Sequence, residues 1–254
     1  MGVKTTLTCK DLAPYFKATR LIPTLHGTSD SVYIVDDMYI LKLFESVTCK
    51  EVEAEVKLLK VCDSLPVARI VREPFVVKGK PALLYEKAKG EVLAHASHAH
   101  IAQIGAFLRH FHAIARHHHS DTPPRFTQTI LHEMIKKSGY TPFMNRFHTL
   151  SLELRNDGII HGDLFIDNAT FEADTLSCVF DFSHSCTGDF LFDLAVVALS
   201  WCQTQEEKKV LLKSYQSSIS LERFEAYIAF AGLYYSGRRY LEQRDFNDLW
   251  RKVG

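Results

Sequence analysis

A polar loop, His161–Asn168, follows the short apolar run Gly158–Ile160 and precedes two short runs of strand-forming residues. Asp181 stands thirteen residues after Asn168, at the end of the second run. An Asp in the loop, an Asn five positions later and a trailing Asp can supply one proton acceptor and two oxygen ligands for magnesium. The pattern predicts a catalytic loop for phosphoryl transfer, with Asp163 as the base and with Asn168 and Asp181 as metal ligands. We expect the histidine that opens the loop, His161, to brace it rather than to react.

Two charged residues interrupt apolar patterns earlier in the chain. Lys42 lies inside the run Tyr39–Phe44, and Glu55 lies on the inward stripe of a helix expected at Cys49–Val61. A buried charge is costly unless it is paired, and an ion pair resolves both burial costs. We therefore predict a Lys42–Glu55 pair, in which Lys42 contacts the α- and β-phosphates of ATP.

Two further segments are candidates for nucleotide contacts. The small polar turn Gly27–Ser31 precedes the first expected hairpin, and its backbone N–H groups and hydroxyls, Ser29 included, could cover phosphates. Any small polar turn has this composition, so the turn alone does not identify a site. The segment Tyr85–Ala88 joins the two halves of the chain, where backbone groups of Glu86 and Ala88 could bond an adenine edge.

The expected secondary structure changes character near Gly90. Before it, a capping box at Thr8–Asp11, two hairpins and one helix predict a small antiparallel sheet with a packed helix. After it, helices dominate. The fold class is therefore α+β, a two-lobed protein-kinase-like fold with a nucleotide-binding lobe at 1–86 and a helical lobe at 87–254 that holds the catalytic loop and substrate site. The expected strands are 31–35, 38–44, 75–77, 82–85, 169–171 and 176–180, and the expected helices are 49–61, 97–116, 127–138, 142–155 and most of the chain from 190 onward.

Charge and cysteine content limit the possible partners. Thirty basic residues balance thirty acidic ones, so no net field favours nucleic acid or an anionic membrane. The polar N-terminus does not resemble a secretory signal, and no apolar run approaches a membrane span. The six cysteines form no C-x-x-C pair and are expected to be reduced thiols. These features predict a cytoplasmic protein without nucleic-acid or membrane partners, and they carry no signal for oligomeric state.

Thirteen histidines are present, and several cluster around the helix expected at 97–116. His95 and His98 could share a helix face and bind a metal, or the cluster could be a solvated helix with a polar loop. We favour the second interpretation because no Cys or carboxylate keeps a ligand-like spacing. The clustered residues are His95, His98, His100, His110, His112 and His117–His119.

The motifs together resemble the aminoglycoside phosphotransferase and choline kinase superfamily, over residues 5 to about 243. Within it, the segment Val179–Val196 with the later pair Trp201-Cys202 is similar to the homoserine kinase branch. Two differences from that branch are a shorter helical lobe and His184, which stands where an aromatic residue is usual. The motifs that carry the resemblance are the loose turn at Gly27 and Ser29, Lys42, Glu55, His161-x-Asp163-x-x-x-x-Asn168, Asp181 and Asp193-x-Ala195.

The resemblance implies ATP and Mg²⁺ as cofactors and a hydroxyl-bearing small molecule as acceptor. It implies the roles already given for the loop residues, phosphate binding by Lys42 and positioning of Lys42 by Glu55. Asp193 would brace the catalytic loop. The candidates for contact with the acceptor are His184, Asp189 and Trp201.

Rival functions differ in what the acceptor site needs. Only eleven residues separate Asp181 from Asp193 and no Ala-Pro-Glu follows, which argues against a protein kinase. The acceptor should therefore be a small molecule, and the resemblance implies homoserine. A choline or ethanolamine kinase would use an aromatic cage, for which Trp201, Tyr234, Tyr235, Tyr240 and Trp250 are available.

An aminoglycoside kinase and a nucleotide-binding pseudoenzyme are the remaining rivals. An aminoglycoside is a polycation, so a kinase for it needs a strongly acidic acceptor pocket. The acidic residues available near the C-terminus are mixed with basic ones: Glu222, Glu225, Glu242 and Asp245 with Arg223, Arg238, Arg239 and Arg244. The second would have no chemical need for Lys42, Asp163, Asn168 and Asp181 together.

Overall fold

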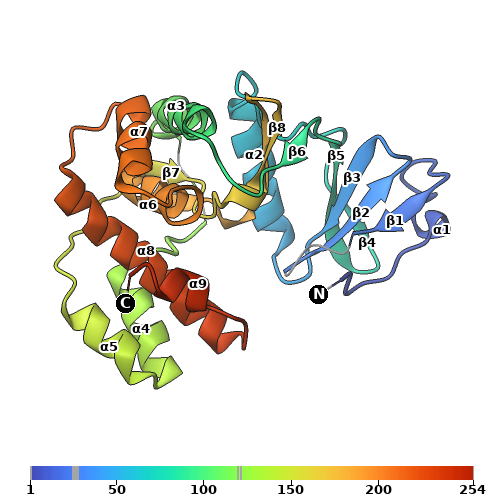
Figure 1. The fold of residues 1–254 in the computed structure, drawn as a ribbon. Helices are drawn as coiled ribbons and strands as arrows, with labels where there is room; N and C mark the ends of the chain where they lie inside the picture. Colours follow the sequence, from blue (N-terminus) through green and yellow to red (C-terminus); the bar gives the residue numbers. More distant parts are fainter. Residues whose placement is uncertain (1, 25–28, 119, 121, 254) are drawn as a thin grey trace. The chain divides into compact units, whose positions relative to one another are not determined.

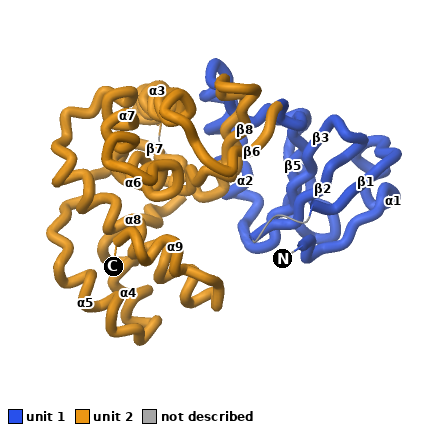
Figure 2. Tube along the Cα trace, in the orientation of Figure 1, with its two compact units in different colours: residues 1–89 blue, residues 90–254 orange. Residues whose placement is uncertain are grey.

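The structure, a computed structural model, describes residues 2–24, 29–118, 120 and 122–253 (Figure 1). Gly27 of the predicted phosphate turn lies outside the described residues. The chain divides into two compact units, 1–89 and 90–254, shown in different colours in Figure 2. The division falls after residue 89, whereas the sequence places it after residue 86.

The first unit is built on an antiparallel sheet, which has five strands among the described residues, in the order β1-β2-β3-β5-β4. The two predicted hairpins form. Their turns, Asp36-Asp37 (φ 50° and 60°) and Lys78-Gly79 (φ 50° and 75°), have two central residues with positive φ, as the twist of a tight hairpin requires. The strands are β1 Leu21–Pro23, β2 Ser31–Val35, β3 Tyr39–Leu43, β4 Phe75–Val77 and β5 Lys80–Glu86.

Two helices accompany this sheet, α1 Cys9–Leu12 and α2 Cys49–Val61. The helix α2 starts at a capping box, in which the Thr48 side chain accepts from the Glu51 amide and the Glu51 carboxylate accepts from the Thr48 amide. Apolar residues of α1, β2, β3 and β5 form one buried cluster that includes Tyr33. The sheet is thus a rigid platform for the side chains of β3.

The second unit is mainly helical. In Figure 1 the helices α3 and α7 pack against each other, as do α6 and α8. Two short sheets lie among the helices, β7 paired with β10 and the order β6-β8-β9. The helices are α3 His98–Ala115, α4 Gln128–Ser138, α5 Thr141–His148, α6 Phe190–Trp201, α7 Gln205–Tyr215, α8 Leu221–Leu241 and α9 Asn247–Trp250. The strands are β6 Glu91–Val92, β7 Gly158–Ile160, β8 Ala169–Glu172, β9 Thr175–Val179 and β10 Cys186–Gly188, and the 3₁₀ turns are η1 Ile166–Asn168 and η2 Phe182–His184.

The helix expected at 142–155 is shorter than predicted and ends at His148. The hydroxyl of Thr149 donates to the carbonyl of Arg146 (2.7 Å), a side-chain bond that competes with continued helical pairing. Beyond it, the amide of Arg155 donates to the carboxylate of Asp189 (2.9 Å), which holds the segment in an extended path. A second correction concerns His95, which precedes the N-cap Ser97 of α3 and so shares no helix face with His98.

The helix α6 is buried along most of its length. It lies in the part of the chain from residue 190 onward that the sequence predicts to be helical. Across the described residues, no helix combines the length and apolar character needed to cross a bilayer.

Candidate active site

The loop after β7 is held by the carboxylate of Asp193, a fully buried residue of α6. One oxygen accepts from the Gly162 amide (2.7 Å); the other accepts from the His161 amide (2.7 Å) and lies 3.0 Å from Nε2 of His112. Because one carboxylate bonds two successive amides, the backbone leading to Asp163 has little freedom. Asp193 thus lies where the sequence predicts a bracing residue.

Further contacts hold the backbone of the loop that follows β7. Gly162 has φ +79°, and a Cβ there would collide with the ring of Phe126. The hydroxyl of Tyr235 on α8 donates to the Gly162 carbonyl. His161 is fully buried, with Nε2 3.1 Å from the Phe180 carbonyl, which places it in the bracing position expected for it.

The carboxylate of Asp163 has an unusual electrostatic setting. Burial, together with the negative charges of Asp181 and Asp167, raises its pKa to about 7, while the Arg238 guanidinium acts in the opposite direction. About 20% of the side chain remains exposed, so the carboxylate is still accessible. A base whose pKa lies near neutrality is well matched to accepting a hydroxyl proton.

The two predicted metal ligands lie at the same end of the β8–β9 hairpin. The amide of Phe180 donates to the Asn168 carbonyl (3.1 Å), which sets Asp181, the next residue, beside Asn168. The Asn168 side-chain amide donates to the Asp163 carbonyl (2.7 Å), and the Ser183 hydroxyl donates to Asp181 Oδ1 (2.6 Å). Asp181 itself has φ 65°, a backbone conformation that turns the chain sharply after the strand.

These two residues suit magnesium. Mg²⁺ is commonly held by one or two carboxylates, with phosphate oxygens and water completing its shell. The hydrogen bond from Asn168 Nδ2 to the loop leaves its Oδ1 as the ligand atom. Among the described side chains, no group of three or more His, Cys, Asp or Glu gathers as a self-sufficient metal site.

In the first unit, Lys42 and Glu55 are both buried, as their positions in the apolar patterns predict. Lys42 Nζ lies 3.3 Å from Asp30 Oδ2 and 4.7 Å from the centre of the Phe44 ring. Glu55 Oε1 accepts from the Tyr85 hydroxyl (2.8 Å). The Lys42–Glu55 ion pair stays a prediction.

Asp30 is a residue that the sequence reasoning missed. It lies directly before β2, and the hairpin register pairs Val32 with Lys42, so the turn brings its carboxylate close to the lysine. Its other oxygen accepts from the Glu45 amide (3.0 Å). The signal that the sequence offers is an acidic residue two positions before Val32, which pairs with Lys42 in the hairpin.

The remaining residues predicted to contact the nucleotide are Ser29, Glu86 and Ala88. The carbonyl of Ser29 accepts from Lys4 Nζ (2.9 Å). The Glu86 amide donates to the Arg69 carbonyl (2.9 Å), so an adenine contact from Glu86 would use its carbonyl. Ala88 is half-buried at the end of the first unit.

Two of the three predicted acceptor residues are buried. Asp189 is buried as the N-cap of α6, where it accepts from the Leu191 amide (2.9 Å) and the Tyr227 hydroxyl (3.1 Å). Trp201 is 1% exposed, and its indole N–H donates to the Leu164 carbonyl (3.1 Å). Both side chains thus use their polar atoms inside the fold, and contact with the acceptor by either residue stays a prediction.

The third acceptor candidate, His184, does lie beside the base. Its Nδ1 is 3.6 Å from Asp163 Oδ2, and its Nε2 is 3.1 Å from Nη1 of Arg238. Arg238, from α8, also donates through Nε to Glu242 (3.0 Å). In the sequence, Arg238 is only one of several charges of mixed sign in this region. Nothing local in α8 indicates that the helical turn at Arg238 lies close to Asp163.

The aromatic residues considered for a choline cage belong to packed clusters. Tyr234 and Tyr235 are buried and pack against Phe126. Tyr240 packs against Phe143 (5.7 Å between ring centres), as does Trp250 (5.0 Å). These contacts give the aromatic residues a role in the core.

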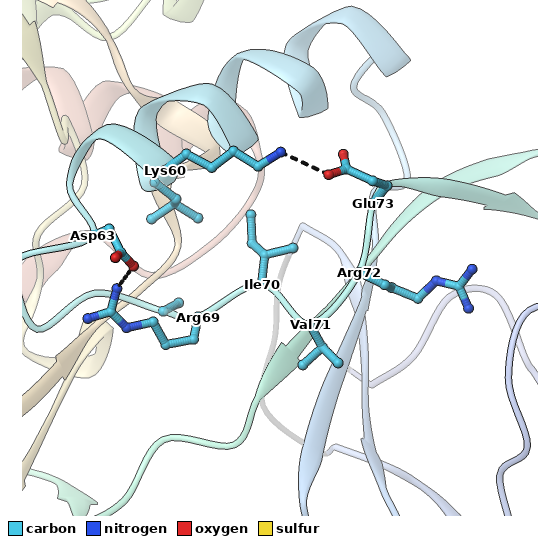
Figure 3. Close-up of a pocket in the computed structure, with 9 residues that line it drawn as sticks. Lys60, Asp63, Arg69, Ile70, Val71, Arg72 and Glu73 are labelled. Carbon is cyan, nitrogen blue, oxygen red and sulfur yellow. Dashed lines mark hydrogen bonds and ion pairs between the residues drawn. The ribbon is translucent and has the colours of Figure 1, made fainter.

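A shallow pocket in the first unit lies between the end of α2 and the segment 68–73 (Figure 3). Two ion pairs cross it, Lys60 with Glu73 (2.8 Å) and Arg69 with Asp63. Its charged groups are thus largely satisfied, and none of the predicted site residues lines it.

The family model of the phosphotransferase enzyme family matches residues 20–227, which include every motif of the catalytic loop. The chain belongs to the phosphotransferase enzyme family.

Curated relatives of this phosphotransferase include two bacterial proteins named homoserine kinase. The one from Neisseria meningitidis serogroup B is 28% identical over 196 residues, which cover 71% of this chain and 63% of the relative. The one from Zymomonas mobilis is 26% identical over 231 residues, covering 78% and 72%. The match thus spans less than two thirds of the Neisseria protein.

Solved structures confirm the predicted α+β fold of this phosphotransferase. The GDP complex of aminoglycoside 2′-phosphotransferase-IIIa has a TM-score of 0.70 at 14% identity, covering 94% of this chain and 92% of that one. Choline kinase LicA from Streptococcus pneumoniae has a TM-score of 0.64 at 17% identity, covering 96% and 95%. At these identities the likeness concerns the fold.

Proposed function

We propose that this phosphotransferase moves the γ-phosphate of ATP to the hydroxyl of homoserine. The observation that carries the reaction type is the loop itself: Asp163, with a pKa near neutrality, lies beside the adjacent pair Asn168 and Asp181. The acceptor is favoured by the homoserine kinase relatives, which match most of this chain.

Each residue of the site has a distinct role in this proposed reaction. Lys42 holds phosphate oxygens and Glu55 positions Lys42, with Ser29 covering the phosphates and the backbones of Glu86 and Ala88 facing adenine. Asn168 and Asp181 hold Mg²⁺, which when bound offsets the charge of the phosphates. The Asp163 carboxylate accepts the proton of the acceptor hydroxyl as the oxygen attacks in line.

In this mechanism most of the rate enhancement comes from positioning and charge neutralisation, and the protein forms no covalent intermediate. The cysteines of the chain are free thiols in the structure, and the reaction consumes ATP, both of which support a cytoplasmic location.

The second candidates are choline or ethanolamine kinase and aminoglycoside phosphotransferase, since solved structures of similar fold carry choline kinase and aminoglycoside phosphotransferase names. The buried state of Trp201, Tyr234 and Tyr235 disfavours an open aromatic cage. A guanidinium beside the base, that of Arg238, disfavours cationic acceptors.

The test is a panel of homoserine, choline, ethanolamine, threonine and kanamycin, followed by ADP release with ATP and Mg²⁺. We expect homoserine to have the highest kcat/KM. A clear preference for choline or kanamycin would contradict the proposed acceptor.

The same assay tests the base. We expect Asp163→Asn to lower kcat by several orders of magnitude with the Kd for ATP nearly unchanged, because the amide cannot accept the proton. The matched control is Glu172→Gln, an exposed carboxylate in the neighbouring hairpin, which should keep full turnover. Near-normal turnover by the Asn variant would remove Asp163 from the mechanism.

A further inference from the structure

The helix α8 brings a guanidinium to the catalytic base through one imidazole ring. Arg238 Nη1 lies 3.1 Å from Nε2 of His184, and Nδ1 of the same ring lies 3.6 Å from Asp163 Oδ2. Arginine is a donor only, so His184 Nε2 must accept this hydrogen bond. The ring proton of the neutral imidazole is therefore on Nδ1, the nitrogen that faces Asp163.

Hydrogen bonds also fix the direction of the guanidinium. Arg238 Nε donates to Glu242 Oε1 (3.0 Å), one turn further along α8. The other oxygen of Glu242 accepts from Arg244 Nη1 (3.0 Å). One carboxylate is thus shared by two guanidinium groups, and the small cluster of Arg238, Glu242 and Arg244 has an excess of one positive charge.

This positive excess lies one imidazole ring away from the carboxylate of Asp163, and it is partly open to solvent. The Arg238 side chain is 28% exposed, whereas its helix neighbours Tyr234 and Tyr235 are buried. A partly exposed guanidinium held in one orientation is suited to a carboxylate, which it can bind through two parallel hydrogen bonds. A cationic acceptor would be repelled at the same place.

We propose that Arg238 binds the carboxylate of the acceptor and so selects alcohols that carry a carboxylate near the reacting hydroxyl. The inference rests on the proposed function and adds to it the residue that determines specificity. His184 positions the guanidinium through its Nε2 and links it to Asp163. A simpler role for Arg238, as a counter-charge for the base alone, would affect every acceptor equally.

The deciding experiment compares homoserine with 3-aminopropan-1-ol, which has a hydrogen in place of the carboxylate. A bidentate arginine–carboxylate contact of the usual strength corresponds to a preference of roughly 10²-fold in kcat/KM for homoserine in the unmodified enzyme. We expect Arg238→Gln to remove most of that preference, because it lowers kcat/KM for homoserine far more than kcat/KM for 3-aminopropan-1-ol, mainly through KM. The control is Arg223→Gln, an exposed arginine on the same helix, which should keep the preference.

The outcomes separate the inference from the proposed function. An equal loss on both acceptors, or no preference in the unmodified enzyme, overturns the role of Arg238 while leaving homoserine phosphorylation intact. Turnover of choline or kanamycin without turnover of homoserine overturns the proposed function. Should Arg238→Gln not fold, Arg238→Lys serves the same comparison, because an ammonium keeps the charge but loses the bidentate geometry. We then expect a reduced preference with retained turnover of 3-aminopropan-1-ol.

Discussion

The raised pKa of Asp163 has a consequence for stability that can be tested without any substrate. The pKa rises from 3.8 to about 7 on folding, chiefly through burial, so the folded chain binds more protons than the unfolded one between these pH values. The contribution of Asp163 to stability is therefore fully present below pH 4 and is lost as the pH rises towards 7, where the buried carboxylate becomes charged. Asp163→Asn removes that charge with almost no change of shape.

The size of the effect follows from the shift. About three pKa units correspond to an upper limit of about 4 kcal/mol, and partial exposure with structural relaxation reduces this to roughly 2 kcal/mol. We expect the Asn variant and the unmodified protein to be equally stable near pH 4. The variant should gain stability progressively up to pH 7 and keep a constant advantage above it, roughly 4–8 °C in Tm for a chain of this size.

The assay is urea unfolding from pH 4 to pH 8, with EDTA and without nucleotide. Tryptophan fluorescence reports on the second unit, because both tryptophans, Trp201 and Trp250, belong to it. Glu172→Gln, which removes an exposed carboxylate, should track the unmodified protein at every pH. A stability difference that does not vary with pH, or a less stable Asn variant at pH 8, would refute the reasoning.

Two further predictions concern the carboxylates of Asp193, which is buried, and Asp30, which is half-buried. Asp193→Asn should lower the unfolding free energy by about 3–5 kcal/mol, because its single NH2 group must face the amide of either His161 or Gly162 and leaves that buried donor without an acceptor; urea unfolding checks this, and a loss below about 1 kcal/mol would contradict it. Asp30→Asn keeps the acceptor for the Glu45 amide but removes the charge that competes with phosphate for Lys42. We expect the Kd for ADP to fall roughly five-fold by titration calorimetry, equivalent to about 1 kcal/mol, whereas weaker binding would show that Asp30 instead orients Lys42.

Locally encoded features were predictable from the sequence. The turns at Asp36-Asp37 and Lys78-Gly79 and the capping box at Thr8–Asp11 depend on residues a few positions apart, and all three form in the structure. The burial of Lys42 and Glu55 also follows from local pattern, since each interrupts an apolar run.

Features that depend on distant contacts were not predictable in this way. The end of α5 is set in part by Asp189, which captures the Arg155 amide from 34 positions away. Trp201 and Asp189 carry polar atoms that are satisfied inside the fold, so the sequence alone does not separate them from residues that contact a ligand. Arg238 comes within one imidazole ring of Asp163 because of how α8 packs in the second unit, and no motif near either residue indicates that packing.

The contacts that hold the catalytic loop also determine when the loop can reach its final geometry during synthesis. The loop's own backbone is held by Asp193, 31 positions after Gly162, and by Tyr235, 73 positions after it. A chain that emerges from the ribosome N-terminus first exposes His161–Asn168 well before either partner exists. Since contacts of large sequence separation form late, the loop should reach its final geometry only when α8 has docked. A fragment ending before α6 would contain the whole motif through Asp181 and still lack an organised active site.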